Sequence, residues 1–153
     1  DSIDGSRTVS AADFFLGVFT TDVEPHELLR EIEIAKPPSG TGCAFEEVSL
    51  RTGDFAMASV AAEIRVEAGR IAAARIAIGG IAGAPFRAGV AEARLVGCEP
   101  AASAVAEIAA TQIEDIEFSD TPGVSAAYRR DATHALLQRT VLSAAETSLR
   151  TSQ

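Results

Sequence analysis

The sequence has few of the residues on which several classes of chemistry depend. Its two cysteines, Cys43 and Cys98, are too far apart for a CxxC motif and too few for a disulfide scaffold or an iron–sulfur cluster. Its two histidines, His26 and His134, stand in no metal-ligand spacing such as HExxH. The sequence also lacks a Gly-x-Ser-x-Gly elbow, a P-loop and a dinucleotide fingerprint. We therefore predict no catalytic residue and no metal ligand, and expect both thiols to pack as small hydrophobes.

Basic residues and long apolar runs are scarce as well. Thirteen lysines and arginines stand against 22 acids, which gives a formal net charge of -9 at pH 7. Nucleic acids and anionic lipids are bound through clustered cations, so neither is an expected partner. No apolar run approaches the ~20 residues that cross a bilayer, and no secretory signal opens the chain. We expect a soluble, cytoplasmic protein without a membrane span.

Aromatic residues make up 5% of the chain and hydrophobic residues 47%, so the core must consist mainly of Ala, Ile, Val and Leu. A chain of 153 residues is long enough for one domain that buries roughly 70% of its unfolded surface. The polar start, residues 1–6, is predicted to be disordered. Residues 7–153 are predicted to form a single domain.

Alternating apolar and polar residues predict the strands. Residues 60–67 are the clearest example, and residues 71–78 follow after Ala68-Gly69, so the two runs predict an antiparallel hairpin. Residues 43–51 predict a further strand. Ile32 and Ile34 alternate with glutamates and predict a half-buried strand that ends at Pro37-Pro38.

Beyond Pro85 the apolar spacing changes to three and four, which predicts helices. A short turn capped by Ser10 is expected first, and three longer helices follow: residues 88–96, a helix beginning at Pro100, and residues 125–149 capped by Ser125. The fold class is therefore α+β, with a small antiparallel sheet of three to four strands packed on a three-helix layer. The residues predicted to face the core are Val90, Ala93, Leu95, Ala101, Val105, Ile108, Ala109, Tyr128, Ala132, Leu136, Leu142 and Ala145.

Three polar clusters are open to more than one interpretation. Adjacent residues in a strand point to opposite faces, so Glu46 and Glu47 do not form a carboxylate pair. The acids at residues 114–117 indicate a solvated helix end. The glycines at 79, 80 and 83 could cradle a phosphate, but a corner between sheet and helix is favoured.

Two arginines, Arg129 and Arg130, open the last predicted helix, where the helix dipole disfavours cations. We therefore expect one of them to bind a carboxylate such as Asp120 or Asp54 and so to join helix and sheet.

Five stretches occur in order between residues 12 and 140. They are residues 12–17 (ADFFLG) with Thr20-Thr21, residues 25–34 (PHELLREIEI), residues 45–56 ending in RTGDFA, residues 74–97 beginning ARIAIGG, and residues 128–139 with YRR and LLQR. Together they resemble the C-terminal domain of the flavoprotein subunit of molybdenum hydroxylases, the family of carbon monoxide and xanthine dehydrogenases.

The resemblance implies a part of an oxidoreductase complex. In this family the subunit holds FAD mainly through glycine-rich loops of a preceding domain, which this chain lacks. The flavin accepts electrons from an iron–sulfur subunit, whose partner is a molybdopterin subunit, and passes them to an acceptor. We expect the chain to close over the flavin ring, and expect the piece alone neither to retain FAD nor to be active.

The resemblance also implies cofactor contacts. Leu29 corresponds to a leucine that lies against the isoalloxazine ring, and residues 43–47 correspond to a segment near the flavin, which makes Phe45, Glu46 and Glu47 candidate contacts. Many members have a lysine at the position of Glu46 or Glu47. Two alternatives stay open: a stand-alone α+β binding or assembly module without flavin, and a small-molecule enzyme that uses the Gly79-Gly80 corner.

Overall fold

A computed structural model describes residues 1–151, so the predicted domain end at residue 153 lies outside the described part. The chain divides into two compact units, Asp1–Pro37 and a second unit that begins at Pro38. Each unit has its own secondary structure. Compactness alone does not define a domain, so the single domain from residue 7 onward stays a prediction.

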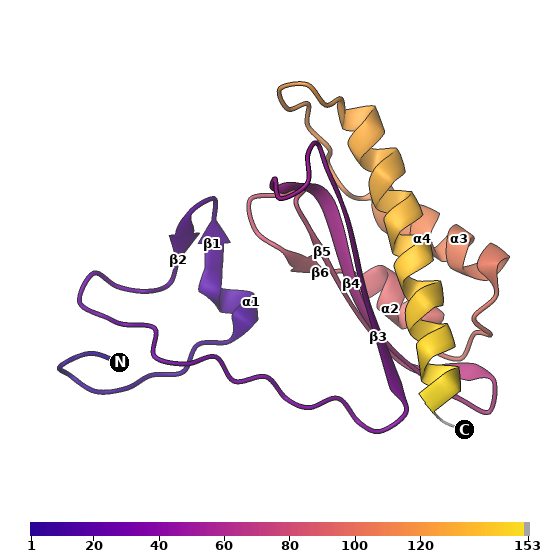
Figure 1. Ribbon diagram of the computed structural model, residues 1–153, viewed down its shortest axis with the longest axis horizontal. Helices are drawn as coiled ribbons and strands as arrows, with labels where there is room; N and C mark the ends of the chain where they lie inside the picture. The colour runs from indigo at the N-terminus through magenta and orange to yellow at the C-terminus, as the bar shows by residue number, and fades with distance from the viewer. Residues whose placement is uncertain (152–153) are drawn as a thin grey trace. The chain divides into compact units, whose positions relative to one another are not determined.

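The second unit is built on a four-stranded antiparallel sheet (Figure 1). The strands lie in chain order: β3 (Thr41–Ser49), β4 (Ala56–Glu67), β5 (Arg70–Gly79) and β6 (Phe86–Arg87). Every second residue of β4 between positions 58 and 66 is buried, as the alternation predicts.

The hairpin between β4 and β5 is also confirmed. Its turn residues, Ala68 and Gly69, have φ values of 47° and 77°. Positive φ at both central residues is typical of the type I′ turn, whose twist matches that of two paired strands.

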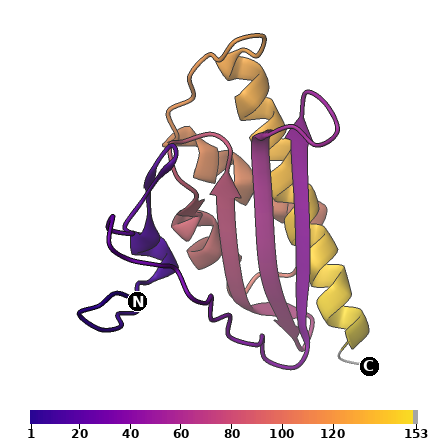
Figure 2. The same cartoon turned by 60° about the vertical axis from the view of Figure 1, so that its left-hand side comes forward.

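Three helices cover one face of this sheet (Figure 2). The longest, α4, packs on β3 and β4, whereas α2 packs on β5 and α3 packs against α2 and α4. The core between the layers consists of small and branched aliphatic side chains, including Ile64, Ile78 and Leu137. The predicted α+β architecture is therefore confirmed. The bounds of the helices are α2 (Gly89–Leu95), α3 (Ala102–Glu114) and α4 (Ala126–Thr151).

Four residues predicted to face the core do not. Val90 is 40% exposed, Tyr128 is 50% exposed, and Ala93 and Ala101 are also exposed. Ala101 precedes the first residue of α3. Each of the other three lies one or two positions away from the buried stripe of its helix, which in α2 consists of Ala91 and Leu95. An error of one residue turns a helical side chain by about 100°, which suffices to move it out of the core.

The first unit is smaller and contains α1 (Ala11–Phe14), β1 (Phe15–Gly17) and β2 (Thr20–Thr21). The predicted cap of α1 is confirmed, because Ser10 Oγ accepts a hydrogen bond of 3.2 Å from the N–H of Ala12. Residues 1–6, predicted to be disordered, include an isolated bridge between Ser2 and Gly5.

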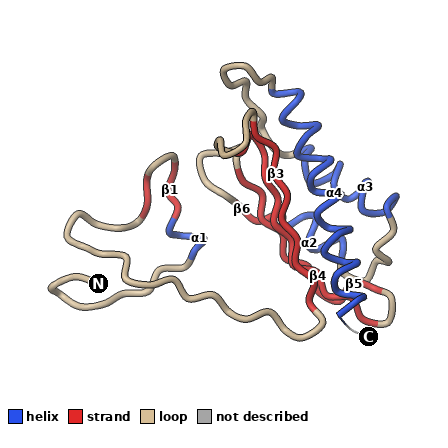
Figure 3. The backbone as a smooth tube through the Cα atoms, viewed as in Figure 1, coloured by secondary structure: helices blue, strands red, loops and turns tan. Residues whose placement is uncertain are grey.

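No helix or strand lies between β2 and β3 (Figure 3). The prediction of a half-buried strand at Ile32 and Ile34 is therefore wrong for the described chain, and these side chains are 76% and 86% exposed. A strand needs a neighbour for its ladder of hydrogen bonds, and no residue within 1–151 supplies one at these positions.

A close contact between helix and sheet in the second unit lies at Gly42 of β3. A Cβ atom at this position would lie 1.9 Å from the carbonyl oxygen of Ala144 and 2.4 Å from the amide nitrogen of Ser148, both in α4. Ser148 joins the same region, because its hydroxyl donates to the Gly40 carbonyl at 2.5 Å and accepts from the N–H of Val66 at 2.9 Å. The helix backbone therefore lies directly on the strand.

Replacing Gly42 by alanine should force α4 away from β3. We expect Gly42→Ala to lower the free energy of unfolding by about 3 kcal/mol, the upper end of the overpacking range. Gly89→Ala is the matched control, since a Cβ atom at Gly89 meets no atom within 4 Å. Chemical denaturation of both variants measures the difference, and equal effects would contradict the close contact.

Arg129 joins the start of α4 to the sheet. It is a charged residue, yet it is buried, with only 6% of its surface exposed. Its guanidinium donates to three backbone carbonyls: Gly80 at 2.5 Å, Ser119 at 2.9 Å and Met57 at 3.4 Å. We call this contact the Arg129 clasp. Three oriented carbonyl dipoles replace the water that the buried cation loses.

The predicted clasp is therefore present, but its predicted acceptor is wrong. Arg129 binds carbonyls rather than the carboxylate of Asp120 or Asp54. Asp120 instead accepts a hydrogen bond of 2.7 Å from the N–H of Ala126 and so caps the beginning of α4.

Two fully buried threonines of α4 differ in their hydrogen bonds. Thr133 Oγ1 donates to the carbonyl of Arg129 at 2.7 Å, whereas Thr140 Oγ1 has no partner among the described residues. A buried hydroxyl without a partner costs about 1–3 kcal/mol.

Valine in place of Thr140 should therefore stabilise the protein by about 1 kcal/mol, because it keeps the shape and removes the unpaired hydroxyl. Thr133→Val should destabilise it by a similar amount, since a formed hydrogen bond is lost. Urea denaturation of both variants is the measurement. A change of the same sign in both would refute this assignment.

Candidate functional site

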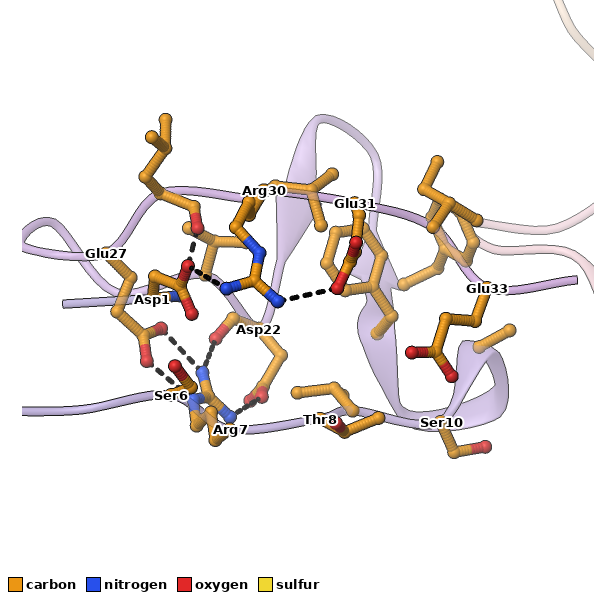
Figure 4. A pocket seen from close by; sticks show the side chains of 18 residues that line it. Asp1, Ser6, Arg7, Thr8, Ser10, Asp22, Glu27, Arg30, Glu31 and Glu33 are labelled. Carbon is orange, nitrogen blue, oxygen red and sulfur yellow. Dashed lines mark hydrogen bonds and ion pairs between the residues drawn. The ribbon is translucent and has the colours of Figure 1, made fainter.

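The first unit contains a cavity of about 430 Å³ whose wall is part apolar and part charged (Figure 4). Leu29, the predicted flavin contact in this unit, is one of the lining residues and is 51% exposed. Leu28 and Leu29 follow a turn at Pro25-His26 that brings them to the cavity wall. The other apolar lining residues include Val9, Phe14, Phe15, Val23 and Ile32.

A cluster of three charged side chains, Arg7, Asp22 and Glu27, lines part of this cavity. Arg7 donates to both carboxylate oxygens of Glu27, at 2.6 and 2.7 Å, and to the carboxylate of Asp22 at 2.5 Å. The N–H of Glu24 also donates to Glu27, at 2.9 Å. The side chain of Glu27 is only 12% exposed, so these donors take the place of water.

The hydrogen bonds from Arg7 and Glu24 lower the pKa of the Glu27 carboxyl from 4.5 to about 2. The same pairing raises the pKa of Arg7 above its ordinary value, mainly through Glu27 and then Asp22. A carboxyl with a depressed pKa stabilises the folded state above its unfolded pKa, and this contribution is lost as the pH falls through the folded value.

Removing the Arg7 guanidinium should therefore restore the ordinary titration of Glu27. In the Arg7→Gln variant we expect the midpoint of the Glu27 carboxyl to rise from about 2 toward 4.5. The matched control is Arg30→Gln, because Arg30 contacts Asp1 and Glu31 rather than Glu27. Carbon-13 NMR of the side-chain carboxyl is the measurement, and an unchanged midpoint in Arg7→Gln would contradict the assigned cause.

In the second unit, Phe45 lies on the face of the sheet that is turned away from α2, α3 and α4. It is 61% exposed and pairs with Ala61, which pairs with Ala77, which in turn pairs with Arg87. Paired residues point to the same face. This row therefore places the ring of Phe45 next to the methyl group of Ala61, with Ala77 beyond it, an apolar surface on which a planar group could lie. The guanidinium of Arg87 at the end of the row is paired with Glu92 of α2.

Glu46 and Glu47 lie on opposite faces of β3, as the alternation predicts. Glu46 is on the helix-covered face, where its carboxylate forms an ion pair of 2.6 Å with Arg139 of α4. Glu47 shares the outward face with Phe45 and is exposed. A flavin contact by either acid stays a prediction, and Glu47 is the one whose carboxylate faces solvent.

The Gly79-Gly80 corner has a packing role. Gly80 has a φ of 79°, and a Cβ atom there would lie 2.6 Å from the carbonyl oxygen of Ala56. Its own carbonyl accepts from Arg129. Backbone approach therefore accounts for this glycine without a phosphate.

Among residues 1–151 no group of three or more His, Cys, Asp or Glu side chains is placed to hold a metal ion. None of the helices in this range has the length and apolar character needed to span a membrane.

Comparison with known families identifies the second unit. Residues 43–144 match the model of the CO dehydrogenase flavoprotein C-terminal domain. The chain belongs to this family. The matched region begins at residue 43, whereas the expected domain began at residue 7, and Leu29 lies before it.

Alignments with individual relatives cover more of the chain than the family model does and include residues of both units. The chain is 35% identical over 138 residues to the glyceraldehyde dehydrogenase medium chain of Sulfolobus acidocaldarius, covering 90% of this chain and 49% of the relative. It is 35% identical over 146 residues to the nicotine 6-hydroxylase medium subunit of Paenarthrobacter nicotinovorans, covering 94% and 50%. The chain thus spans about half the length of these relatives.

A solved structure agrees with the sequence matches. The quinoline 2-oxidoreductase of Pseudomonas putida 86 superimposes with a TM-score of 0.91 and 34% identity, covering 97% of this chain and 51% of that chain. The carbon monoxide dehydrogenase of Hydrogenophaga pseudoflava gives a TM-score of 0.86 and 33% identity.

The sequence reasoning did not find Arg7 or its two carboxylates. A signal exists, because Arg7 is one of three cations in a unit with eight acids, so pairing is expected. The choice of Asp22 and Glu27 among those acids depends on the turn at Pro25, which brings Glu27 back to Arg7 from 20 residues away.

Proposed function

We propose that this chain is the C-terminal half of the FAD subunit of a molybdenum-containing hydroxylase. The observation that carries the proposal is the family match over residues 43–144. It is supported by relatives that are medium chains or medium subunits, and the chain spans about half the length of each. In the intact subunit it closes over the flavin. No observation favours the module without flavin or the enzyme at the Gly79-Gly80 corner.

The residues present suit a flavin. Leu29 and Phe45 are apolar and half-exposed: Leu29 lines the cavity of the first unit, and Phe45 lies on the outward face of the sheet. FAD, when bound, supplies the redox chemistry, which passes electrons from iron–sulfur clusters to an acceptor. Phe45 would contact the ring and exclude water from it, and Leu29 is a separate candidate contact in the first unit. Glu47 would set the local charge, while Glu46 would stay with Arg139.

The proposed partners follow from the assignment of the chain to a FAD subunit. The missing part of the subunit would grip the pyrophosphate of FAD, an iron–sulfur subunit would supply electrons, and a molybdopterin subunit would oxidise the substrate. We place the assembly in the cytoplasm. We propose that the chain alone does not retain FAD and is inactive without these partners.

The full-length subunit should be yellow and its visible flavin band should bleach when substrate reduces the assembled complex. Phe45→Ala should raise the dissociation constant of FAD about tenfold, since loss of an aromatic contact worth about 1.4 kcal/mol has that effect. Phe55→Ala is the matched control, because Phe55 is 83% exposed and is not a predicted contact. Flavin fluorescence titration measures both.

Two results would overturn the proposal. A colourless full-length protein that does not take up added FAD would exclude the flavin. Equal FAD affinities in the Phe45 and Phe55 variants would remove Phe45 from the site while leaving the family membership intact.

A further inference from the structure

In the first unit, outside β1 and β2, Asp1 and Leu28 exchange the hydrogen bonds of an antiparallel pair. The N-terminal amine of Asp1 donates to the carbonyl of Leu28 at 3.0 Å, and the N–H of Leu28 donates to the carbonyl of Asp1 at 2.8 Å. Exchange of both bonds between two residues defines the hydrogen-bonded pair of an antiparallel ladder. Arg30 adds an ion pair of 3.1 Å to Asp1, as the diagonal neighbour on the same face does in a sheet.

The chain after Leu28 has the pattern of a strand but no described neighbour. Ile32 and Ile34 fall on the face of Leu28, and all three are at least 70% exposed. Glutamates occupy the alternate positions 31 and 33. Large apolar side chains in such an alternation are expected to be covered on one face and paired along the backbone.

We propose that residues 29–34 form a strand whose partner is the polypeptide immediately preceding Asp1 in the intact subunit. The Asp1–Leu28 pair is then the last rung of a longer antiparallel ladder. This inference rests on the proposed function, under which the chain follows an upstream half of similar length.

The register of the ladder follows from this pair. Partners run in opposite directions along antiparallel strands, so Leu29 lies opposite the first residue before Asp1 and Glu31 lies opposite the third. Hydrogen-bonded pairs alternate with non-bonded ones, so the N–H groups of Arg30, Ile32 and Ile34 point toward the partner. Those of residues 29, 31 and 33 point away from it.

The covalent connection favours this occupant over a second copy of the chain. A segment that precedes Asp1 is already held in register by two hydrogen bonds and an ion pair, so it enters the ladder without an association step. A second copy would have to displace that contact or to bind beyond it.

A cross-strand disulfide tests the register in the full-length subunit. In a background with Cys43→Ser and Cys98→Ser, cysteine is placed at Glu31 and at the third residue before Asp1, a non-bonded pair whose side chains lie close. The matched control places the second cysteine one residue nearer to Asp1, where it points to the opposite face. We expect the intramolecular disulfide to be at least about tenfold more abundant in the variant with the predicted register than in the control variant.

Amide hydrogen exchange provides a second measurement that needs no cysteine variant. In the full-length subunit the N–H groups of Ile32 and Ile34 should exchange at least about tenfold more slowly than those of Glu31 and Glu33. Equal exchange at even and odd positions would overturn the pairing, as would a disulfide that favours the shifted register or joins two molecules.

The flavin band of the same preparations separates this inference from the function on which it rests. Yellow protein without the predicted disulfide and exchange pattern overturns the strand pairing and leaves the flavin subunit standing. Colourless protein with the predicted disulfide supports the pairing and overturns the flavin assignment.

Discussion

The second unit depends on the direct contact of one 26-residue helix, α4, with the sheet. Its backbone reaches β3 at Gly42, Ser148 bonds to Gly40 just before β3 and to Val66 near the end of β4, and Arg129 holds the first turn. With few aromatic residues available, the core gains its density from short side chains and close backbones rather than from large rings. The outward face of the sheet is thereby left for other contacts.

The two faces of the sheet have different roles. Residues of β3 that point inward, such as Glu46, are used by α4, whereas Phe45 and Glu47 point outward from the same strand. A single strand thus links the packing of the helix to the surface proposed for the flavin.

Sequence patterns predicted the elements of the second unit well, because β4 alternates buried and more exposed residues over positions 58–66 and α4 begins at a clear cap, Ser125. They failed where a residue's role depends on distant backbone. The acceptors of Arg129 come from residues 57, 80 and 119, which no local pattern connects. The pairing of Arg7 likewise depends on a turn, and the exposure of Ile32 depends on the absence of a described neighbour.

The Arg129 clasp binds main-chain oxygens, and every residue type supplies such an oxygen. The side chains at Met57 and Ser119 can therefore change during evolution without loss of the acceptor. Homologous sequences would then show an invariant arginine with no partner position that varies in step with it, so methods that infer contacts from correlated substitutions would overlook one of the strongest ties between helix and sheet.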